Sequence, residues 1–250
     1  MKYLITANFK KLCRRLLCPA ALLVPLYNLW KLLLMYLNAR PAGHNYFISS
    51  HLYFLSFYGV VCAAVWGAYL GFDDIQSHLF SGLTLTLKRK PAILQGILSL
   101  GVFLAAFAAA LFVLLCVCAL FIGERIYLGL SLLQLVVVIL FLWSWGIVAM
   151  AVSFVTRSLS GGILTVLAFN YVLSMLHGML PKALLHLSLL YSQKGVLARV
   201  FDNAVNAQGS MFGIPFYHHN FAWSLAASIG YPLLLLLLLL LYAEKVELND

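Results

Sequence analysis

Ionised side chains are scarce in this chain of 250 residues. Asp, Glu, Lys and Arg together make up 9% of the sequence, and the 7 acidic residues are far outnumbered by 16 Lys and Arg. A soluble domain carries about 25% charged residues, whereas 64% of this chain is hydrophobic. The shortage of charge excludes an ordinary water-soluble domain, and it predicts that much of the surface faces lipid.

Signatures of catalysis are missing as well. The sequence has no G-x-x-x-x-G-K-[ST] phosphate loop and no H-E-x-x-H zinc motif. The 7 acidic residues lie outside the apolar runs, so no run carries the acidic relay of a proton-driven pump. Cys116 and Cys118 are two residues apart and would point to different faces of a helix. We therefore expect no catalytic residue, no cofactor and no metal site.

Several uncharged runs are long enough to cross a membrane, which takes about 20 helical residues. Lipid leaves backbone groups only two ways to pair, in helices or in closed barrels, and these runs lack the alternation of barrel strands. The prediction is an all-α membrane protein with a single transmembrane domain over residues 1–250. About six spans are expected, at residues 16–37, 53–72, 93–122, 126–155, 161–180 and 221–242.

Basic residues predict the orientation, because they concentrate in cytoplasmic loops. With the N-terminus inside, ten Lys and Arg residues fall on the cytoplasmic side and five on the outer side. We expect a multi-pass protein of the cytoplasmic (inner) membrane with both termini cytoplasmic. The net charge of +9 is then a topology signal, and no nucleic-acid partner is needed to explain it. A signal peptide is the alternative for the first span, but Lys31 would interrupt its apolar part.

Two segments carry amphipathic patterns on the predicted cytoplasmic side. The predicted helix of residues 1–15 and the residue after it place Ile5, Phe9, Leu12 and Leu16 on one stripe with basic residues on other faces, which is typical of an interfacial helix. Residues 73–92 begin with two Asp residues, which favour a helix start, and Pro91 limits the continuation. The residues expected to form this short helix and its basic end are Asp74, Ile75, Leu79, Phe80, Leu83, Leu87, Lys88, Arg89 and Lys90. Residues 83–87 also alternate like a strand, but an isolated strand would leave its edges unpaired.

Small and polar residues in two spans suggest how the helices pack. Gly59, Ala63, Gly67 and Gly71 recur every four residues and form a row that lets another helix approach closely. Packing within the chain is favoured over dimerisation. Asn170 either bonds a neighbouring helix or lines a translocation path.

Residues 181–220 form a long segment on the predicted outer side. Forty residues without regular structure would be unusual, so we expect this segment to be extracellular or re-entrant and to contain helices. His44 and His51 are placed in the other large outer loop.

This layout resembles the type-2 permeases of ATP-binding-cassette exporters. The resemblance depends on an amphipathic N-terminal helix, a long outer segment before the last span, and the run of residues 82–96 between the second and third spans. In that family, a leucine, threonine, proline and basic-pair run leads into a glycine of the third span. Here the usual proline ahead of the basic residues is missing, and Pro91 follows them instead.

The resemblance implies a mechanism and a set of partners. Two such subunits, identical or related, would pair around a central path among membrane lipids, and a separate cytoplasmic ATPase would bind beneath each. Residues 74–87 would form the coupling helix seated in the ATPase. The cargo would be hydrophobic or amphipathic, such as a peptide, antimicrobial or drug. A secondary transporter or channel without an ATPase, and a non-transporting immunity or assembly protein, are the alternatives.

Overall fold

The computed structural model describes residues 8, 10, 12–14, 16–39, 45–76, 89–172, 179, 188–202 and 221–249, of which 39, 73–76, 89–92 and 243–249 are described by their backbone alone. Within this part of the chain the regular elements are helices, and no strand is present. Their order is α2 (Leu17–Ala39), α3 (Tyr46–Tyr58), α4 (Val60–Gln76), α6 (Arg89–Ile122), α7 (Leu128–Thr156), α8 (Leu159–Leu167), the π-helical turn η1 (Ala168–Val172), α11 (Leu189–Val200) and α13 (Phe221–Asn249).

Four of the described helices are long and apolar enough to cross a membrane, namely α2, α6, α7 and α13. The pair α3 and α4 passes the same test when taken together as one span bent by 40°. The predicted class, an all-helical multi-pass membrane protein, is confirmed with four or five such spans. The count of six stays a prediction, because the described helix within the fifth predicted range, Leu159–Val172, is too short to span by itself.

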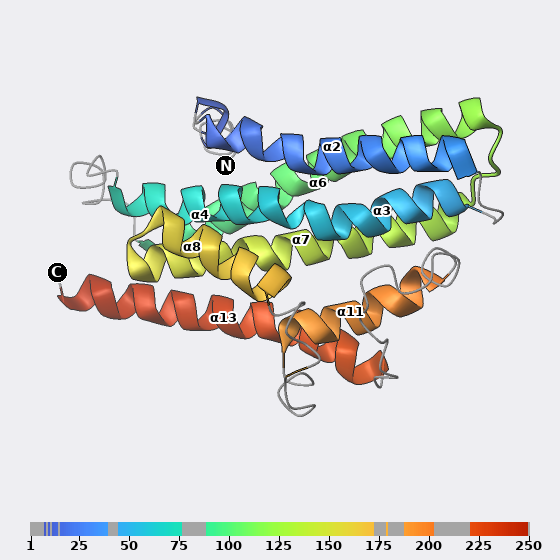
Figure 1. Cartoon of the computed structure of the whole chain (residues 1–250). Coiled ribbons are helices and arrows are strands. Elements are labelled where there is room, and N and C mark those ends of the chain that lie inside the picture. Colours follow the sequence, from blue (N-terminus) through green and yellow to red (C-terminus); the bar gives the residue numbers. More distant parts are fainter. Residues whose placement is uncertain are drawn as a thin grey trace.

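The long helices lie side by side in an elongated bundle (Figure 1). We name its two ends after residues in the turns. At the Glu124 end, residues 123–127 join α6 to α7, and at the Arg157 end, Arg157 and Ser158 join α7 to α8. Arg157 has a left-handed φ of 52°, and the Ser158 hydroxyl accepts a hydrogen bond from the Gly161 amide. This capped turn sends the chain back into the bundle.

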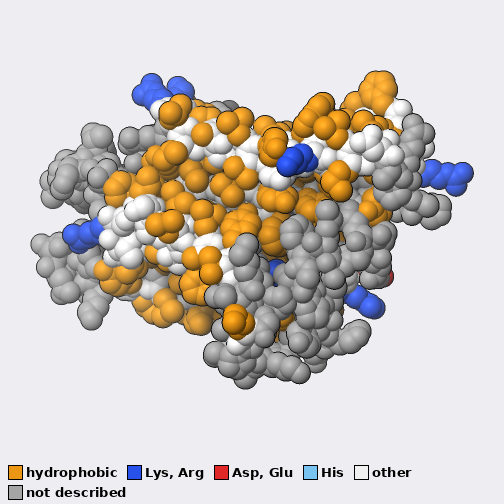
Figure 2. All heavy atoms as spheres, viewed as in Figure 1, with side chains coloured by type: hydrophobic (Ala, Val, Ile, Leu, Met, Phe, Trp, Pro, Cys, Tyr) orange, Lys and Arg blue, Asp and Glu red, His pale blue; other side chains and the backbone are white. Residues whose placement is uncertain are grey.

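On the face of the bundle drawn in Figure 2, the described side chains are mostly apolar. On α13, Leu233, Leu237 and Leu241 are more than half exposed, as are Val113 and Phe121 on α6. In water this much exposed leucine would mark an aggregation surface. In a bilayer it is the surface that the acyl chains solvate, which accounts for the shortage of charge in the sequence.

Three helix boundaries differ from those expected. α3 begins at Tyr46, so His51 is a buried residue of a helix and the expectation that it lies in an outer loop is wrong. α4 continues to Gln76, which places Asp73 and Asp74 in its last turns, and α6 already begins at Arg89. Pro91 therefore lies in the first turn of α6, where its fixed φ suits a helix and its missing N–H leaves no bond unmade.

Candidate functional site

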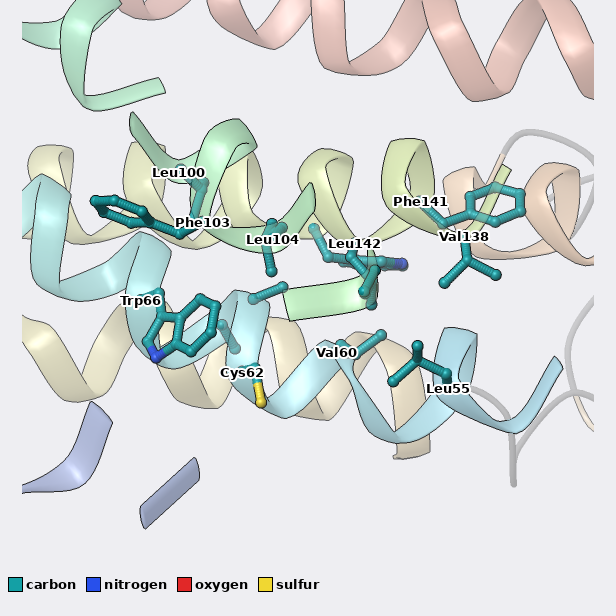
Figure 3. Close-up of a cluster of buried hydrophobic side chains, with 14 of the residues drawn as sticks. Leu55, Val60, Cys62, Trp66, Leu100, Phe103, Leu104, Val138, Phe141 and Leu142 are labelled. Atoms are coloured by element: carbon teal, nitrogen blue, oxygen red, sulfur yellow. The ribbon is translucent and has the colours of Figure 1, made fainter. Parts of the chain in front are cut away.

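The centre of the bundle is the close approach of α4 to α7. A Cβ added at Gly67 would overlap the Gly146 carbonyl oxygen and lie 2.9 Å from its carbonyl carbon, and one added at Gly71 would lie 3.0 Å from the Met150 carbonyl carbon. Gly59 faces Leu142, and Ala63 is fully buried. The row of four small residues singled out from the sequence thus lies in the core, where Figure 3 shows the large side chains that surround it. Only glycine lets two backbones approach this closely.

Helix α2 is attached to α4 by two hydrogen bonds to backbone carbonyls. Pro25 has no N–H to offer the Ala21 carbonyl four residues before it, and the Cys62 thiol lies 3.3 Å from that oxygen as a donor. The Trp66 indole N–H donates to the Cys18 carbonyl at 3.1 Å. A carbonyl left unpaired in lipid costs several kcal/mol, so the Cys62 thiol offsets part of the cost of Pro25, while Trp66 adds a second link between the two helices.

A network of buried polar side chains ties α3 to α7 at the Glu124 end. Asn45, which is fully buried and has a left-handed φ of 59°, donates from Nδ2 to the Ser49 hydroxyl at 3.1 Å and to the Ser131 hydroxyl at 2.9 Å. Its Oδ1 accepts from the Tyr127 amide at 3.1 Å. Each buried polar group has a partner here, which makes such a network rigid.

Gln134 extends this network to α11. The Ser49 hydroxyl donates to Gln134 Oε1 at 2.8 Å, and Gln134 Nε2 donates to the Val200 carbonyl at 3.0 Å. The ring of Phe201, just beyond α11, lies 5.8 Å from that of Tyr53 on α3. The carboxyl-terminal end of α11 is therefore fixed to both α3 and α7.

Glu124 caps the first turn of α3. Its carboxylate accepts from the Phe47 amide at 2.9 Å, which neutralises an otherwise unpaired donor at the positive end of the helix dipole. Burial raises the pKa of Glu124, and the hydrogen bonds from the Phe47 and Tyr46 amides oppose that rise. The turn between α6 and α7 is thereby joined to the start of the bent span.

The end of α3, the π-helical turn η1 and the middle of α11 meet near the middle of the bundle. Phe57 lies close to the bend of the span Tyr46–Phe72, and its carbonyl accepts from the Tyr171 hydroxyl of η1 at 3.0 Å. The Lys194 ammonium of α11 lies 5.4 Å from the centre of the Phe57 ring, within reach of a cation–π interaction. The bend between α3 and α4, the π-helical turn η1 and Lys194 thus lie at the same position along the bundle. Irregular helices and charged residues within membrane spans are frequent at functional sites.

Helix α11 starts beside α13, near the middle of the bundle's length, and runs toward the Glu124 end (Figure 1). Leu189 in its first turn lines a crevice together with Pro232, which is at the midpoint of the span Phe221–Tyr242. Val200 at the other end reaches Gln134. The Ser188 hydroxyl caps the buried start by accepting from the Tyr191 amide at 3.2 Å. This helix lies in the segment 181–220 that the sequence predicts to be extracellular or re-entrant, and a re-entrant path through a membrane stays a prediction.

The predicted coupling residues are described only in part. Asp74 and Ile75 belong to the last turn of α4, and Arg89 and Lys90 to the first turn of α6, by their backbones alone. Leu79, Phe80, Leu83, Leu87 and Lys88 lie outside the described residues. In the predicted interfacial helix, Leu12 is buried while Lys10 and Arg14 are exposed, and the Asn8 amide donates to the Ser99 hydroxyl of α6 at 3.1 Å. Asn170 lies in η1 and is buried.

The polar network and Lys194 were not found by sequence reasoning. Asn45 and Glu124 lie in short connections, where polar residues are ordinary. Gln134 did carry a signal, because it interrupts the apolar run of residues 126–155 and polar residues within a membrane helix face protein. Within the described residues, no group of three or more His, Cys, Asp or Glu is placed to hold a metal ion.

Comparison with family models, with curated proteins and with solved structures finds no match for this chain.

Proposed function

We propose that this chain is the membrane-spanning permease subunit of an ATP-binding-cassette exporter, and that it moves a hydrophobic or amphipathic substrate out of the cell. ATP hydrolysis takes place on a separate cytoplasmic ATPase. The permease pairs with a second copy or a related subunit. The chain itself supplies the path and two conformational states, and ATP acts through its different effect on those states.

The observation that carries the proposal is the charge and pattern of the connection between α4 and α6. Both helix ends lie at the Arg157 end of the bundle, since α4 runs parallel to α7 from Gly59 beside Leu142 to Gly71 beside Met150. Arg89, Lys90 and Arg157 belong to this end, which supports its assignment to the cytoplasmic side by the positive-inside rule. The connection carries apolar residues at every fourth position, followed by a basic cluster. An amphipathic segment so placed suits a groove on a cytoplasmic partner.

Co-purification of the tagged chain from its own cells with a cytoplasmic P-loop ATPase tests the proposal. Replacing Leu79 and Leu83 by Asp removes two residues of the apolar stripe and abolishes the complex, while the protein still inserts and elutes as a single species in detergent. Arg125→Asp is the matched control, because Arg125 is exposed at the opposite end of the bundle, and it leaves the complex intact. An ATPase that stays bound to the Leu79 and Leu83 double variant contradicts the coupling role.

A secondary transporter is the second candidate, and the junction of Phe57, Tyr171 and Lys194 favours it. Interrupted helices that end near the bilayer midplane around a charged residue are typical of ion-coupled carriers. The two functions differ in their energy source. Uptake of substrate into vesicles that depends on an ion gradient and proceeds without ATPase supports this second function over the exporter.

A further inference from the structure

The interface between α11 and α13 combines an apolar crevice with a row of unpaired polar atoms. The two helices pack against each other and run in opposite directions. α11 runs toward the Glu124 end, whereas Tyr242 of α13 packs its ring 6.3 Å from that of Phe154 near the Arg157 end. The crevice and the polar atoms, which are described next, follow one another along this antiparallel pair of helices.

The crevice has a volume of about 270 Å³ and is open toward the lipid-facing side of α13. Its walls come from α7, α11 and α13 and include Val148, Leu189, Tyr231, Pro232, Leu235 and Leu238. Pockets for drug-sized ligands measure about 300–1,000 Å³, so the crevice is small for such a ligand, and its apolar lining suits part of one alkyl chain. Pro232 sets its depth at the middle of the span, where acyl chains are the surrounding medium.

The polar atoms form a seam that we define as Ser192, Gln193, Ser224 and Ser228. Each of these residues is more than 90% buried. The Ser228 hydroxyl donates to the Ser224 carbonyl at 2.6 Å. The hydroxyls of Ser192 and Ser224 and the Gln193 Nε2 have no hydrogen-bond partner within the described residues. Buried donors of this kind are costly and are rare in native proteins.

Helical periodicity places the seam next to the crevice. Ser192 and Gln193 follow Leu189 by three and four residues, so they lie on the same face of α11 one turn nearer the Glu124 end. On α13, Ser224, Ser228, Tyr231, Leu235 and Leu238 follow a 4, 3, 4, 3 spacing and also share one face. Pro232 and Ser224 are eight residues apart, which is about 12 Å along a helix. Half of the hydrocarbon core is about 15 Å, so Ser224 lies near the depth at which acyl chains join their ester groups.

We propose that the crevice and the seam together bind an ester-linked acyl chain of a membrane lipid, which enters from the bilayer when α11 separates from α13. The alkyl chain occupies the crevice, and ester carbonyl oxygens accept hydrogen bonds from the unpaired donors of the seam. Opening is favoured because the closed interface leaves donors unpaired. The bond between Gln134 and Val200 holds the carboxyl-terminal end of α11, so the amino-terminal end is the part that moves. The inference goes beyond the exporter function, because it requires no ATPase.

Photolabelling of the full chain in phosphatidylcholine vesicles tests this site. The probe is phosphatidylcholine with a photoactivatable diazirine in the middle of one chain, and labelled peptides are mapped by mass spectrometry. We expect label concentrated on the residues around Leu189 and Tyr231. Leu189→Trp fills the crevice and removes that label, whereas Leu237→Trp, on the exposed face of α13, does not. Label spread evenly over the exposed faces of α2, α6 and α13 would reflect ordinary surrounding lipid and overturn the proposal.

The seam is tested by an ether-linked probe with identical chains. The wild type prefers the ester probe by about fivefold, the effect of one hydrogen bond, and Gln193→Leu and Ser224→Ala lower that preference. Both substitutions also raise the thermal stability of the lipid-free protein, because an unpaired buried donor is removed. Ser228→Ala is the matched control and brings no such gain. Loss of stability in Gln193→Leu and Ser224→Ala, or equal labelling by both probes in the wild type, contradicts the proposed role of the seam. Loss of ATPase binding alone would contradict only the exporter function.

Discussion

Replacing Gly67 by alanine is the most direct perturbation of the bundle centre. The added Cβ would lie 2.9 Å from the Gly146 carbonyl carbon and 3.0 Å from its Cα, and it would overlap the carbonyl oxygen. Carbon atoms in ordinary contact are about 3.5–4.0 Å apart, so α4 and α7 must separate by roughly 0.6 Å or more at this point. Backbone atoms cannot rotate away as a flexible side chain would.

The expected cost of Gly67→Ala follows from two opposing effects. Overpacking of a well-packed core costs about 1–3 kcal/mol. Alanine in place of glycine in a helix gains about 0.4–1 kcal/mol through the unfolded state and helix propensity. The net loss therefore lies between about 0 and 2.6 kcal/mol, with about 1.3 kcal/mol from the midpoints of the two ranges. Gly230→Ala should be neutral or slightly stabilising because nothing lies within 4 Å of its added Cβ.

Thermal unfolding in detergent, followed by tryptophan fluorescence and by size-exclusion chromatography of heated samples, measures this difference. Gly230→Ala is the matched control on a helix of the same bundle. Gly71→Ala should behave like Gly67→Ala, because its Cβ would lie 3.0 Å from the Met150 carbonyl carbon. If Gly67→Ala melts at the same temperature as Gly230→Ala, the close approach of α4 to α7 is wrong.

Three further predictions concern the hydrogen bonds that join the helices. Cys62→Ala should lower the melting temperature by leaving the Ala21 carbonyl unpaired, at a cost of about 1–3 kcal/mol, while Cys62→Ser keeps a donor and should recover most of that loss. Gln134→Leu should release α11, so that limited proteolysis cuts residues 188–202 faster than in the wild type; unchanged cleavage would refute the link to Val200. Burial raises the pKa of Glu124 above 4.5, so the folded state holds this proton more readily than the unfolded state. As the pH falls through the raised pKa, protonation of Glu124 should therefore raise the melting temperature. The full increase is reached below pH 4.5. A Glu124→Gln variant with the same pH dependence as the wild type would contradict this.

Much of the fold could be predicted because composition and periodicity act locally. A run such as residues 126–155 has too few charges for water and too many residues for a barrel strand, so helix α7 follows from the sequence alone. The row from Gly59 to Gly71 indicated close packing because its spacing repeats on one face. These are properties of a single segment and need no knowledge of its neighbours.

The site could not be predicted, because it is made by contacts between distant segments. Asn45 and Ser131 are 86 residues apart in the chain, and nothing in either local sequence indicates the other. The bend near Phe57 and the buried start of α11 likewise depend on which helices pack together. The end of α4 at Gln76 and the start of α6 at Arg89 differ from the expected boundaries for a related reason. Carboxylates and prolines mark helix starts and stops in an isolated segment, and packing against other helices can override them.

The depth of α11 in the bilayer is the measurement that tests the central claim most directly. A spin label at residue 189, in a chain whose native cysteines are replaced and which carries Ser at position 62, is compared in lipid nanodiscs with labels at 237 and 125. We predict that the label at 189 shows the high oxygen and low nickel accessibility of a position at membrane depth, like the label at 237. Nickel accessibility at 189 equal to that at 125 would place α11 in water and contradict a re-entrant helix within a lipid-embedded bundle.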